Sequence, residues 1–197
     1  ADFEILNLET ENPDDFPKKL DFPVVVKPAM EGSSIGLSMV ENKNEFIKAI
    51  EEASKYDKVL LIEKKLSGKE LTVGIIGNQK PQVLPVIEIK PKVESFFSFK
   101  SKYTKGMTEY LVPAPIGEKV TQLAQKIALK AYRALGCRGM GRVDMILDES
   151  DGVPKVLEIN TIPGMTETSL LPMAARAAGM SFADLVMKIV EYALEKP

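Results

Sequence analysis

Residues 138–169 read RGMGRVDMILDESDGVPKVLEINTIPGMTETS, and this stretch decides the fold that the sequence predicts. Two apolar runs flank the turn-rich segment DESDG, a pattern typical of a β-hairpin. If the strands pair about the centre of that segment, Arg142 lies opposite Asn160 and Asp144 lies opposite Glu158. Side chains alternate between the faces of a strand, so these four polar groups share one face. The other face is expected to be a core face, with Val143, Met145, Leu147, Leu157 and Ile159.

The polar face of this hairpin predicts a metal site. Two carboxylates opposed in a sheet, Asp144 and Glu158, repel each other unless a cation lies between them. Oxygen ligands without His or Cys suit a hard cation such as Mg²⁺, which keeps positions open for substrate phosphates. The alternative is a solvated sheet face with a chance ion pair. We favour the metal site, because the four groups fall in register and a Gly-Met-Thr loop follows directly.

Composition restricts the classes of partner. A chain of 197 residues allows one or two domains with a sizeable core. Its hydrophobic content of 45% and charged content of 27% are ordinary for a soluble globular protein. A net charge of −2 and a pI near 5.5 give no sign of nucleic-acid binding. Because no apolar segment is long enough to span a bilayer, we expect no membrane partner either.

Histidine and cysteine usage restricts the chemistry. The sequence contains no histidine, which excludes a Ser-His-Asp triad, a His general base and His-ligated zinc within this chain. The single cysteine, Cys137, cannot form an internal disulfide, which fits a reducing compartment and predicts a cytoplasmic location. The chemistry must therefore depend on Lys, Arg, Asp, Glu, Ser, Tyr and backbone groups.

A loop rich in Gly and Ser follows the apolar strand expected at residues 23–27. It runs from Pro28 to Gly36 and leads into another short strand. Such a loop can aim backbone N–H groups at a phosphate, although a plain hairpin turn has the same composition. It is not a Walker loop, because the Gly-Lys-Ser/Thr ending before a helix is missing. Lys27, at the end of the preceding strand, adds a positive charge that favours phosphate binding.

The remaining pattern predicts an α+β fold. Amphipathic periodicity predicts helices at 42–56, 117–135, 170–178 and 181–195. Further strands are expected at 3–8, 59–66, 70–77, 82–89 and 108–112.

Residues 90–107 have neither a helical nor a strand period. A long loop of this kind is uncommon within a compact domain, and is often a lid or disordered. Its aromatic residues, Phe96, Phe97, Phe99 and Tyr103, argue against disorder. Aromatic residues among lysines also suit nucleic-acid stacking, but the acidic chain favours a lid over a phosphate ligand.

Together these motifs resemble the ATP-grasp superfamily and, within it, the D-alanine–D-alanine ligase family. The resemblance rests on VKPAMEGSSIG, LIEKKLSGKELTV, KSKYTKGMTEYLVPA, GCRGMGRVDMIL and LEINTIPGMTETSLLPMAARAAG, and covers residues 3–195. It implies two α+β lobes that clasp ATP, a smaller lobe at 1–76 and a larger one at 77–197 with a lid at 90–107. It also implies ATP-dependent ligation of two D-alanines through an acyl phosphate, for peptidoglycan precursor synthesis.

The resemblance implies a nucleotide site. Lys27 would contact the ATP phosphates, and the loop with Ser33 and Ser34 would cover them. The acid at Glu70 would hold the ribose hydroxyls. Lys102 would reach the transferred phosphate from the lid, which Tyr103 would latch shut. The adenine site would be lined by Glu63, Lys64 and Leu66.

The resemblance also implies metal and substrate sites. The ligands of Mg²⁺ or Mn²⁺ would be Asp144, Glu158 and Asn160. Arg142 and the backbone N–H of Gly164 would stabilise the tetrahedral oxyanion. Ser169 and Leu170 would hold the carboxylate of the second D-alanine. The residues implied to take part in catalysis are Ser33, Lys102, Tyr103, Arg142 and Gly164.

The chain departs from the family pattern at its beginning. Complete members carry an N-terminal domain, with a further nucleotide-binding Lys, before the strand matched by residues 3–8, and that domain holds the first D-alanine. The chain thus resembles the central and C-terminal domains only, and we expect it to be inactive or weakly active by itself. The alternatives are a nucleotide-binding module without ligase activity and another ATP-grasp carboxylate–amine ligase. For the full-length protein the family implies a homodimer.

Overall fold

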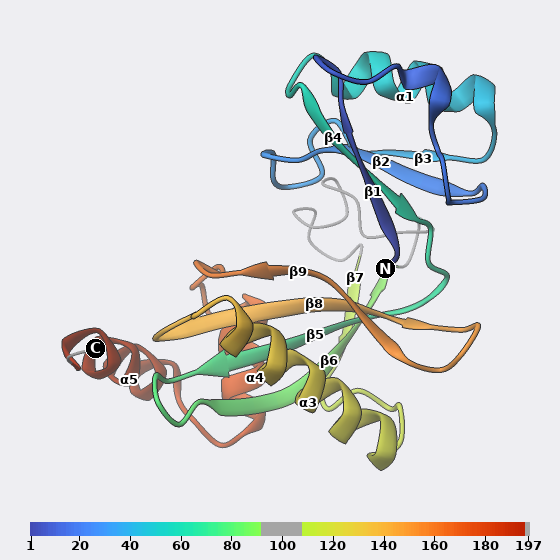
Figure 1. The fold of residues 1–197 in the computed structure, drawn as a ribbon. Coiled ribbons are helices and arrows are strands. Elements are labelled where there is room, and N and C mark those ends of the chain that lie inside the picture. The colour runs from blue at the N-terminus through green and yellow to red at the C-terminus, as the bar shows by residue number, and fades with distance from the viewer. Residues whose placement is uncertain (92–107, 196–197) are drawn as a thin grey trace. The chain divides into compact units, whose positions relative to one another are not determined.

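The computed structural model describes residues 1–91 and 108–195, in two compact units, Ala1–Leu66 and Ser67–Pro197 (Figure 1). The boundary expected after residue 76 therefore falls ten residues earlier (76 − 66 = 10). The reason is strand β5 (Gly68–Ile76), which pairs along its length with strands of the second unit. The described parts combine helices with two antiparallel sheets, which confirms the α+β prediction.

The first unit is a four-stranded sheet covered by helix α1 (Lys43–Ala53). Its strand order is β1-β4-β2-β3, with bounds Phe3–Asn7, Val59–Lys64, Val24–Pro28 and Ser38–Val40, and a short 3-10 helix, η1, spans Pro13–Asp15. Asn42 caps α1, since its side chain accepts a hydrogen bond from the N–H of Glu45. The buried face of α1 is the one predicted from periodicity: Phe46, Ala49, Ile50 and Ala53.

The second unit is a five-stranded sheet with helices on both faces. Its order is β7-β6-β5-β8-β9, where β6 spans Gln82–Pro91, β7 Thr108–Leu111, β8 Met140–Asp148 and β9 Pro154–Asn160. Helix α3 (Glu118–Ala134) packs on one face. Helices α4 (Leu170–Ala177) and α5 (Phe182–Leu194) pack with the other (Figure 1).

The β8–β9 hairpin has the predicted register at its polar end. Arg142 pairs with Asn160, and Asp144 pairs with Glu158. Alternation along β8 places Arg142 and Asp144 on the face opposite α3, because the intervening Val143 lies in the core beneath that helix. The prediction that four polar groups share one sheet face is thereby confirmed.

A β-bulge alters the other half of the hairpin. The register shifts after Asp144, so that Met145 pairs with Val156 and Leu157 is an extra residue on β9. Val156 packs against the core beneath α3, whereas Leu157 is 39% exposed. The prediction that Leu157 faces the core was wrong, because the extra residue reverses the alternation. The other residues of that predicted face do pack there: Val143, Met145, Leu147 and Ile159.

Two polar contacts fix the helices of the second unit. The fully buried Tyr132 of α3 donates a hydrogen bond from its hydroxyl to the carbonyl oxygen of Gly77 at 2.9 Å, and burial raises the pKa of Tyr132 to about 12. Helix α5 begins with a capping box between Ser181 and Asp184. The hydrogen bond from the Ser181 hydroxyl lowers the pKa of the Asp184 carboxyl.

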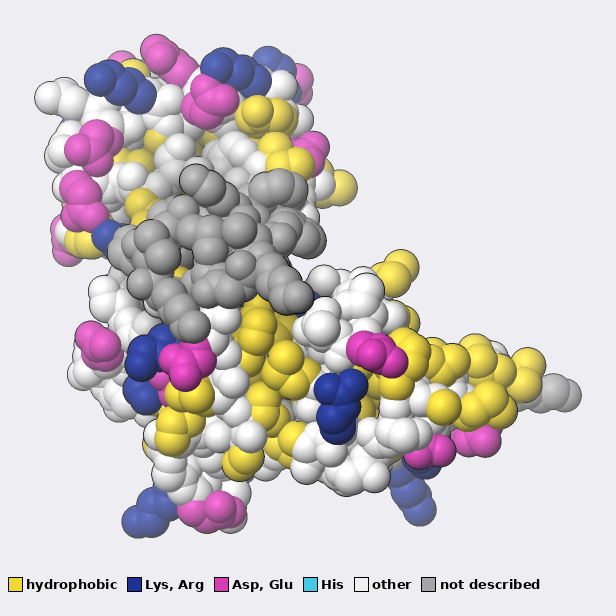
Figure 2. Space-filling model, turned by 180° about the vertical axis from the view of Figure 1, so that it is seen from behind, with side chains coloured by type: hydrophobic (Ala, Val, Ile, Leu, Met, Phe, Trp, Pro, Cys, Tyr) yellow, Lys and Arg dark blue, Asp and Glu magenta, His cyan; other side chains and the backbone are white. Residues whose placement is uncertain are grey.

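Helix α5 carries most of its apolar surface outward. Figure 2 shows hydrophobic side chains gathered along it, and its exposed large apolar residues are Val186, Met187, Val190 and Leu194. Within residues 1–91 and 108–195, no single helix has the length and hydropathy to cross a membrane. In that described part of the chain, the one helix pair that passes the test is α4 with α5, across a bend of 107°.

Candidate functional site

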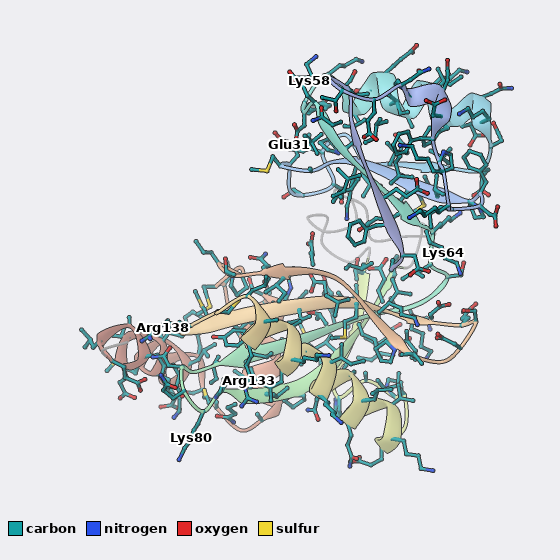
Figure 3. The ribbon with its side chains drawn as sticks, viewed as in Figure 1. Glu31, Lys58, Lys64, Lys80, Arg133 and Arg138 are labelled. Carbon is teal, nitrogen blue, oxygen red and sulfur yellow. The ribbon has the colours of Figure 1, made fainter. Side chains whose placement is uncertain are left out.

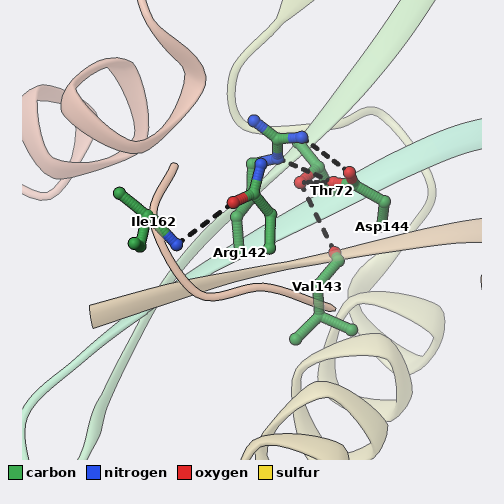
Figure 4. Close-up of polar contacts among 6 residues, drawn as sticks. Thr72, Arg142, Val143, Asp144 and Ile162 are labelled. Carbon is green, nitrogen blue, oxygen red and sulfur yellow. Dashed lines mark hydrogen bonds and ion pairs between the residues drawn. The ribbon is translucent and has the colours of Figure 1, made fainter. Parts of the chain in front are cut away.

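Asp144 is the centre of a hydrogen-bonded cluster on the second sheet (Figure 4). The guanidinium of Arg142 donates from Nε to Oδ1 of Asp144 at 2.8 Å and from Nη2 to Oδ2 at 2.7 Å. Thr72, the register partner of Asp144 on β5, donates from its hydroxyl to Oδ1 at 2.6 Å. Arg142 and Asp144 are 16% and 17% exposed, so this two-point ion pair is largely shielded from solvent.

The sequence reasoning missed Thr72. The residue stands in a run of strand-forming residues and has no motif of its own. Its role becomes visible only when β5 is placed beside β8, a strand that begins 64 residues after β5 ends (140 − 76 = 64). The alternation of side chains along β5 could have pointed to Thr72. It puts the polar Thr72 and Glu70 on one face of the strand and the apolar Leu71 and Val73 on the other.

The side-chain oxygen atoms on this face suit a hard divalent cation. Glu158 is exposed opposite Asp144, and the side-chain oxygen of Asn160 accepts a hydrogen bond from the N–H of Ile162 at 3.1 Å (Figure 4). Among the residues that the structure describes, no three Asp, Glu, Cys or His side chains form a metal-binding group. A cation held on this face therefore needs the Asn160 amide beside the two carboxylates, an all-oxygen set of the kind that Mg²⁺ and Mn²⁺ prefer.

The loop after β9 brings Gly164 against Ser169. A Cβ atom built on Gly164 would lie 2.9 Å from the Ser169 hydroxyl, so a larger residue at this position would displace that hydroxyl. That hydroxyl accepts a hydrogen bond from the N–H of Thr166 at 3.1 Å, and does not cap α4. The side chain of Leu170 is 8% exposed and belongs to the core, so only its backbone N–H, in the first turn of α4, can serve a ligand.

In the first unit, the predicted phosphate loop has an unusual backbone. Ser33 and Ser34 both have positive φ angles, 53° and 62°, which non-glycine residues rarely adopt. Turn hydrogen bonds run from the N–H of Ile35 to the carbonyl oxygen of Gly32 at 3.0 Å, and from the N–H of Leu37 to that of Ser34 at 3.3 Å. Strained residues of this kind persist where the surrounding structure holds them, and they cluster at ligand-binding sites.

Lys27 and Glu63, both predicted to bind nucleotide, form an ion pair. Lys27 lies on β2 and Glu63 on the paired strand β4, where the register places Glu63 opposite Val25, two residues from Lys27. The pair is therefore diagonal on one face. The Lys27 Nζ and Glu63 Oε2 atoms are 2.7 Å apart, and both side chains are mostly buried, at 22% and 18% exposure.

The other residues predicted to bind nucleotide lie on several different elements or outside the described residues. Lys64 is exposed at the end of β4, and Figure 3 shows it there, while Leu66 is half-buried at the end of the first unit. Glu70 lies on β5 in the second unit, on the Thr72 face. Lys102 and Tyr103 lie outside the described residues, as does most of the predicted lid at 90–107; residues 90 and 91 end β6.

Comparison with known proteins shows which family the chain matches. The family described as D-ala D-ala ligase C-terminus matches residues 3–191. A D-alanine--D-alanine ligase from Methylacidiphilum infernorum is 53% identical over 176 residues, which cover 88% of this chain and 56% of that protein. The chain spans somewhat more than half the length of the curated relatives it matches.

Solved structures agree with the sequence match. The D-alanine--D-alanine ligase from Bacillus anthracis, in a crystal structure with ATP, has a TM-score of 0.81 and 35% identity, over 98% of this chain and 60% of that one. The VanG D-Ala:D-Ser ligase from Enterococcus faecalis has a TM-score of 0.85 and 30% identity, over 98% of this chain and 56% of that one. The chain therefore belongs to the D-alanine–D-alanine ligase family, whose C-terminal part it matches.

Proposed function

We propose that this chain binds ATP with Mg²⁺ or Mn²⁺ and provides the catalytic face of an ADP-forming D-alanine–D-alanine ligase. The observation that carries the proposal is the shared sheet face of Arg142, Asp144, Glu158 and Asn160, with Asp144 fixed by Thr72. The family membership and the ATP complex of a related ligase support it. In this proposal the cell uses the product for peptidoglycan synthesis in the cytoplasm, and the full-length protein is a homodimer.

On the second unit, Asp144, Glu158 and Asn160 would hold the cation, which when bound offsets the negative charge of the phosphates. Arg142 is already aligned by its two hydrogen bonds to Asp144. Its guanidinium is permanently charged and planar, which suits it to stabilise an oxyanion together with the backbone N–H of Gly164. Ser169 and Leu170 would hold the carboxylate of the second D-alanine at the start of α4, with Leu170 contributing its backbone N–H.

On the first unit, the loop with Ser33 and Ser34 would cover the phosphates, with Lys27 contributing a positive charge. Glu63, Lys64 and Leu66 would line the adenine site, and Glu70 of the second unit would hold the ribose hydroxyls. Lys102 and Tyr103 remain sequence-based predictions of residues that reach the transferred phosphate and close the lid.

The proposed reaction suits a chain without histidine. The carboxylate of one D-alanine attacks the γ-phosphate of ATP to give an acyl phosphate and ADP. The amine of the second D-alanine then attacks the acyl carbon, and phosphate leaves. Both steps depend on positioning and on stabilisation of developing charge more than on a protein nucleophile. Lys27, Lys102 and Arg142 would provide that stabilisation.

A second candidate is a ligase that uses another amine. The match to the D-Ala:D-Ser ligase, at a TM-score of 0.85, is as good as the match to the D-alanine enzyme. The structural agreement therefore supports the ATP-dependent carboxylate–amine chemistry more strongly than it supports the identity of the amine. A third candidate, a nucleotide-binding module without ligase activity, has the same nucleotide residues.

Calorimetric titration of the chain with ADP, in the presence and absence of Mg²⁺, tests the nucleotide site. We expect Mg²⁺-dependent binding, and its absence would contradict the proposal. Phosphate release from ATP is then measured with D-alanine alone and with D-alanine plus D-serine, and the dipeptides are identified by mass spectrometry. Mixed dipeptide in excess would favour the second candidate. Because we expect the chain to be inactive or weakly active by itself, nucleotide binding without any dipeptide would fit the first and the third candidate alike, whereas any dipeptide would exclude the third.

A further inference from the structure

Both ends of the loop between β2 and β3 contact the same dipeptide, Tyr56-Asp57, which lies in the connection between α1 and β4. At the beginning of the loop, the N–H of Met30 donates to Oδ2 of Asp57 at 3.0 Å. The other carboxylate oxygen, Oδ1, accepts from the N–H of Val59 at 3.0 Å. The carbonyl oxygen of Val59 in turn accepts from the N–H of Ala29 at 2.9 Å.

The end of the loop packs on Tyr56. Gly36 has a φ of +68°, and a Cβ built on it would lie 2.9 Å from Cδ2 of the Tyr56 ring and 2.8 Å from Cγ of Pro28. The backbone therefore lies directly against the ring, an approach that only glycine permits. The loop is thus held by hydrogen bonds at one end and by packing at the other, with Ser33 and Ser34 between them.

We propose that Asp57 and Tyr56 are positioning residues that hold the Ser33–Ser34 loop in the shape that binds nucleotide phosphates. The inference rests on the proposed function, since it assumes that this loop covers the phosphates. It adds two residues that belong to neither the loop nor the motifs that suggested it.

The loop needs such support for two reasons. Two successive non-glycine residues with positive φ are unfavourable unless the surroundings enforce them. The loop is also exposed: Met30 is 86% exposed, and Figure 3 shows Glu31 on its outer part. Few contacts of its own side chains can therefore maintain its shape. Besides the two turn hydrogen bonds within the loop, the contacts with Tyr56 and Asp57 hold it.

A local role alone does not account for the contacts of Asp57. An aspartate that only closes the turn into β4 needs the bond to Val59, two residues away. The bond to Met30 joins residues 27 apart in sequence and serves the loop. The hydrogen bond from the N–H of Val59 lowers the pKa of the Asp57 carboxyl, and the bond from the N–H of Met30 lowers it further. The carboxylate is therefore ionised at neutral pH, with both oxygens able to accept hydrogen bonds.

The test compares Asp57→Asn and Tyr56→Ala with Asp21→Asn, a matched control at an exposed aspartate of the same unit. Asparagine has one acceptor oxygen, so it can satisfy either Met30 or Val59 but not both. Because Tyr56 is 48% exposed, its truncation leaves the core intact and provides a second test if Asp57→Asn does not fold. Circular dichroism establishes that each variant is folded.

Two measurements are made on the full chain. The rate of amide exchange at residues 30–37, measured without nucleotide, shows how firmly the loop conformation is held. The affinities for MgADP and for adenosine, compared by titration, show how much the phosphates contribute to binding. We expect exchange to become about 10-fold faster in Asp57→Asn and Tyr56→Ala, and MgADP affinity to fall by about 10-fold or more, as for loss of one hydrogen bond to a charged group. Adenosine affinity and the control variant should remain unchanged.

The outcomes separate this inference from the proposed function. Two results would overturn the positioning role without affecting the phosphate site. One is unchanged amide exchange of the loop in both variants. The other is unchanged MgADP affinity of the variants, provided that the wild type binds MgADP more tightly than adenosine. A wild-type chain that binds MgADP no better than adenosine would overturn the phosphate site and this inference together. Equal losses of MgADP and adenosine affinity would show a general effect on the unit and also count against the inference.

Discussion

The hydroxyl of Thr72 lies 2.6 Å from a carboxylate oxygen of Asp144, on the strand paired with its own. The same hydroxyl is 3.4 Å from the carbonyl oxygen of Val143, but it has one proton, and the charged, closer acceptor holds it. Thr72 is 1% exposed, so water does not compete for this bond. Asp144 is therefore oriented by a buried donor on one side and by Arg142 on the other.

We predict that Thr72→Val weakens metal binding while preserving the fold, because valine keeps the shape of threonine and removes only the donor. Loss of an outer-shell partner of a metal ligand typically lowers metal affinity by roughly 10–100-fold. The measurement is titration of Mn²⁺ in the presence of ADP, followed by electron paramagnetic resonance. Thr72→Ser, which retains the hydroxyl, should restore most of the affinity; a serine variant as weak as the valine variant would point to packing instead.

Glu158→Gln should weaken Mn²⁺ binding more strongly than Thr72→Val, because it removes the charge of a proposed ligand. We expect a loss of at least roughly 100-fold, the upper end of the range for outer-shell changes. The fold should be intact, since Glu158 is exposed. Glu149→Gln, an exposed glutamate at the turn of the same hairpin, is the matched control. Equal Mn²⁺ affinities of the two variants would exclude Glu158 as a ligand.

Tyr132→Phe should destabilise the second unit by about 1 kcal/mol at pH 7, since the hydrogen bond to Gly77 is lost. The difference should shrink at alkaline pH. The pKa of Tyr132 is raised from 10.0 to about 12 in the folded chain, so its stabilisation is complete below pH 10 and is lost as pH rises toward 12. Urea unfolding between pH 7 and 12 measures this. Tyr192→Phe is the control, and a constant difference between wild type and Tyr132→Phe would contradict the prediction.

Asp184→Asn should destabilise α5 at neutral pH and have little effect in acid. The folded pKa of Asp184 lies below the model-compound value of 3.8, so its contribution is present above that value and is lost as pH falls through the lowered pKa. Removal of a capping interaction lowers the stability of a helix. Amide exchange of α5 at pH 7, and thermal unfolding from pH 7 to 2.5, provide the test. Ser181→Ala should also destabilise α5, and part of its loss should persist in acid, because the bond from the Asp184 N–H to the serine oxygen does not depend on pH. A loss in Asp184→Asn that is independent of pH would exclude the charged capping interaction.

Sequence alone was sufficient where one local rule fixes the geometry. The spacing of Arg142 and Asp144 against Glu158 and Asn160, with a turn between them, determined the register of the polar end. The apolar period of α1 identified its buried face in the same way. In both cases the relevant distances lie within one hairpin or one helix, so strand alternation or helical periodicity decides the outcome.

Sequence alone was insufficient to predict contacts that depend on the pairing of segments far apart in the chain. The pairing of Thr72 with Asp144 depends on β5 lying beside β8, and the position of β5 also sets the boundary after Leu66. Asp57 reaches Met30 only through the pairing of β2 with β4. Alternation also cannot reveal an extra residue in a strand, which is why Leu157 was assigned to the wrong face.

The bulge at Leu157 has a consequence for insertions and deletions. A deletion of this one residue would leave every existing pair of the hairpin in place, with Met145 still opposite Val156 and Asp144 still opposite Glu158. A one-residue deletion between Glu158 and Asn160 would instead turn Asn160 to the other face and away from Asp144. Length variation among natural relatives should therefore be tolerated at Leu157 and excluded two residues further along, at Ile159.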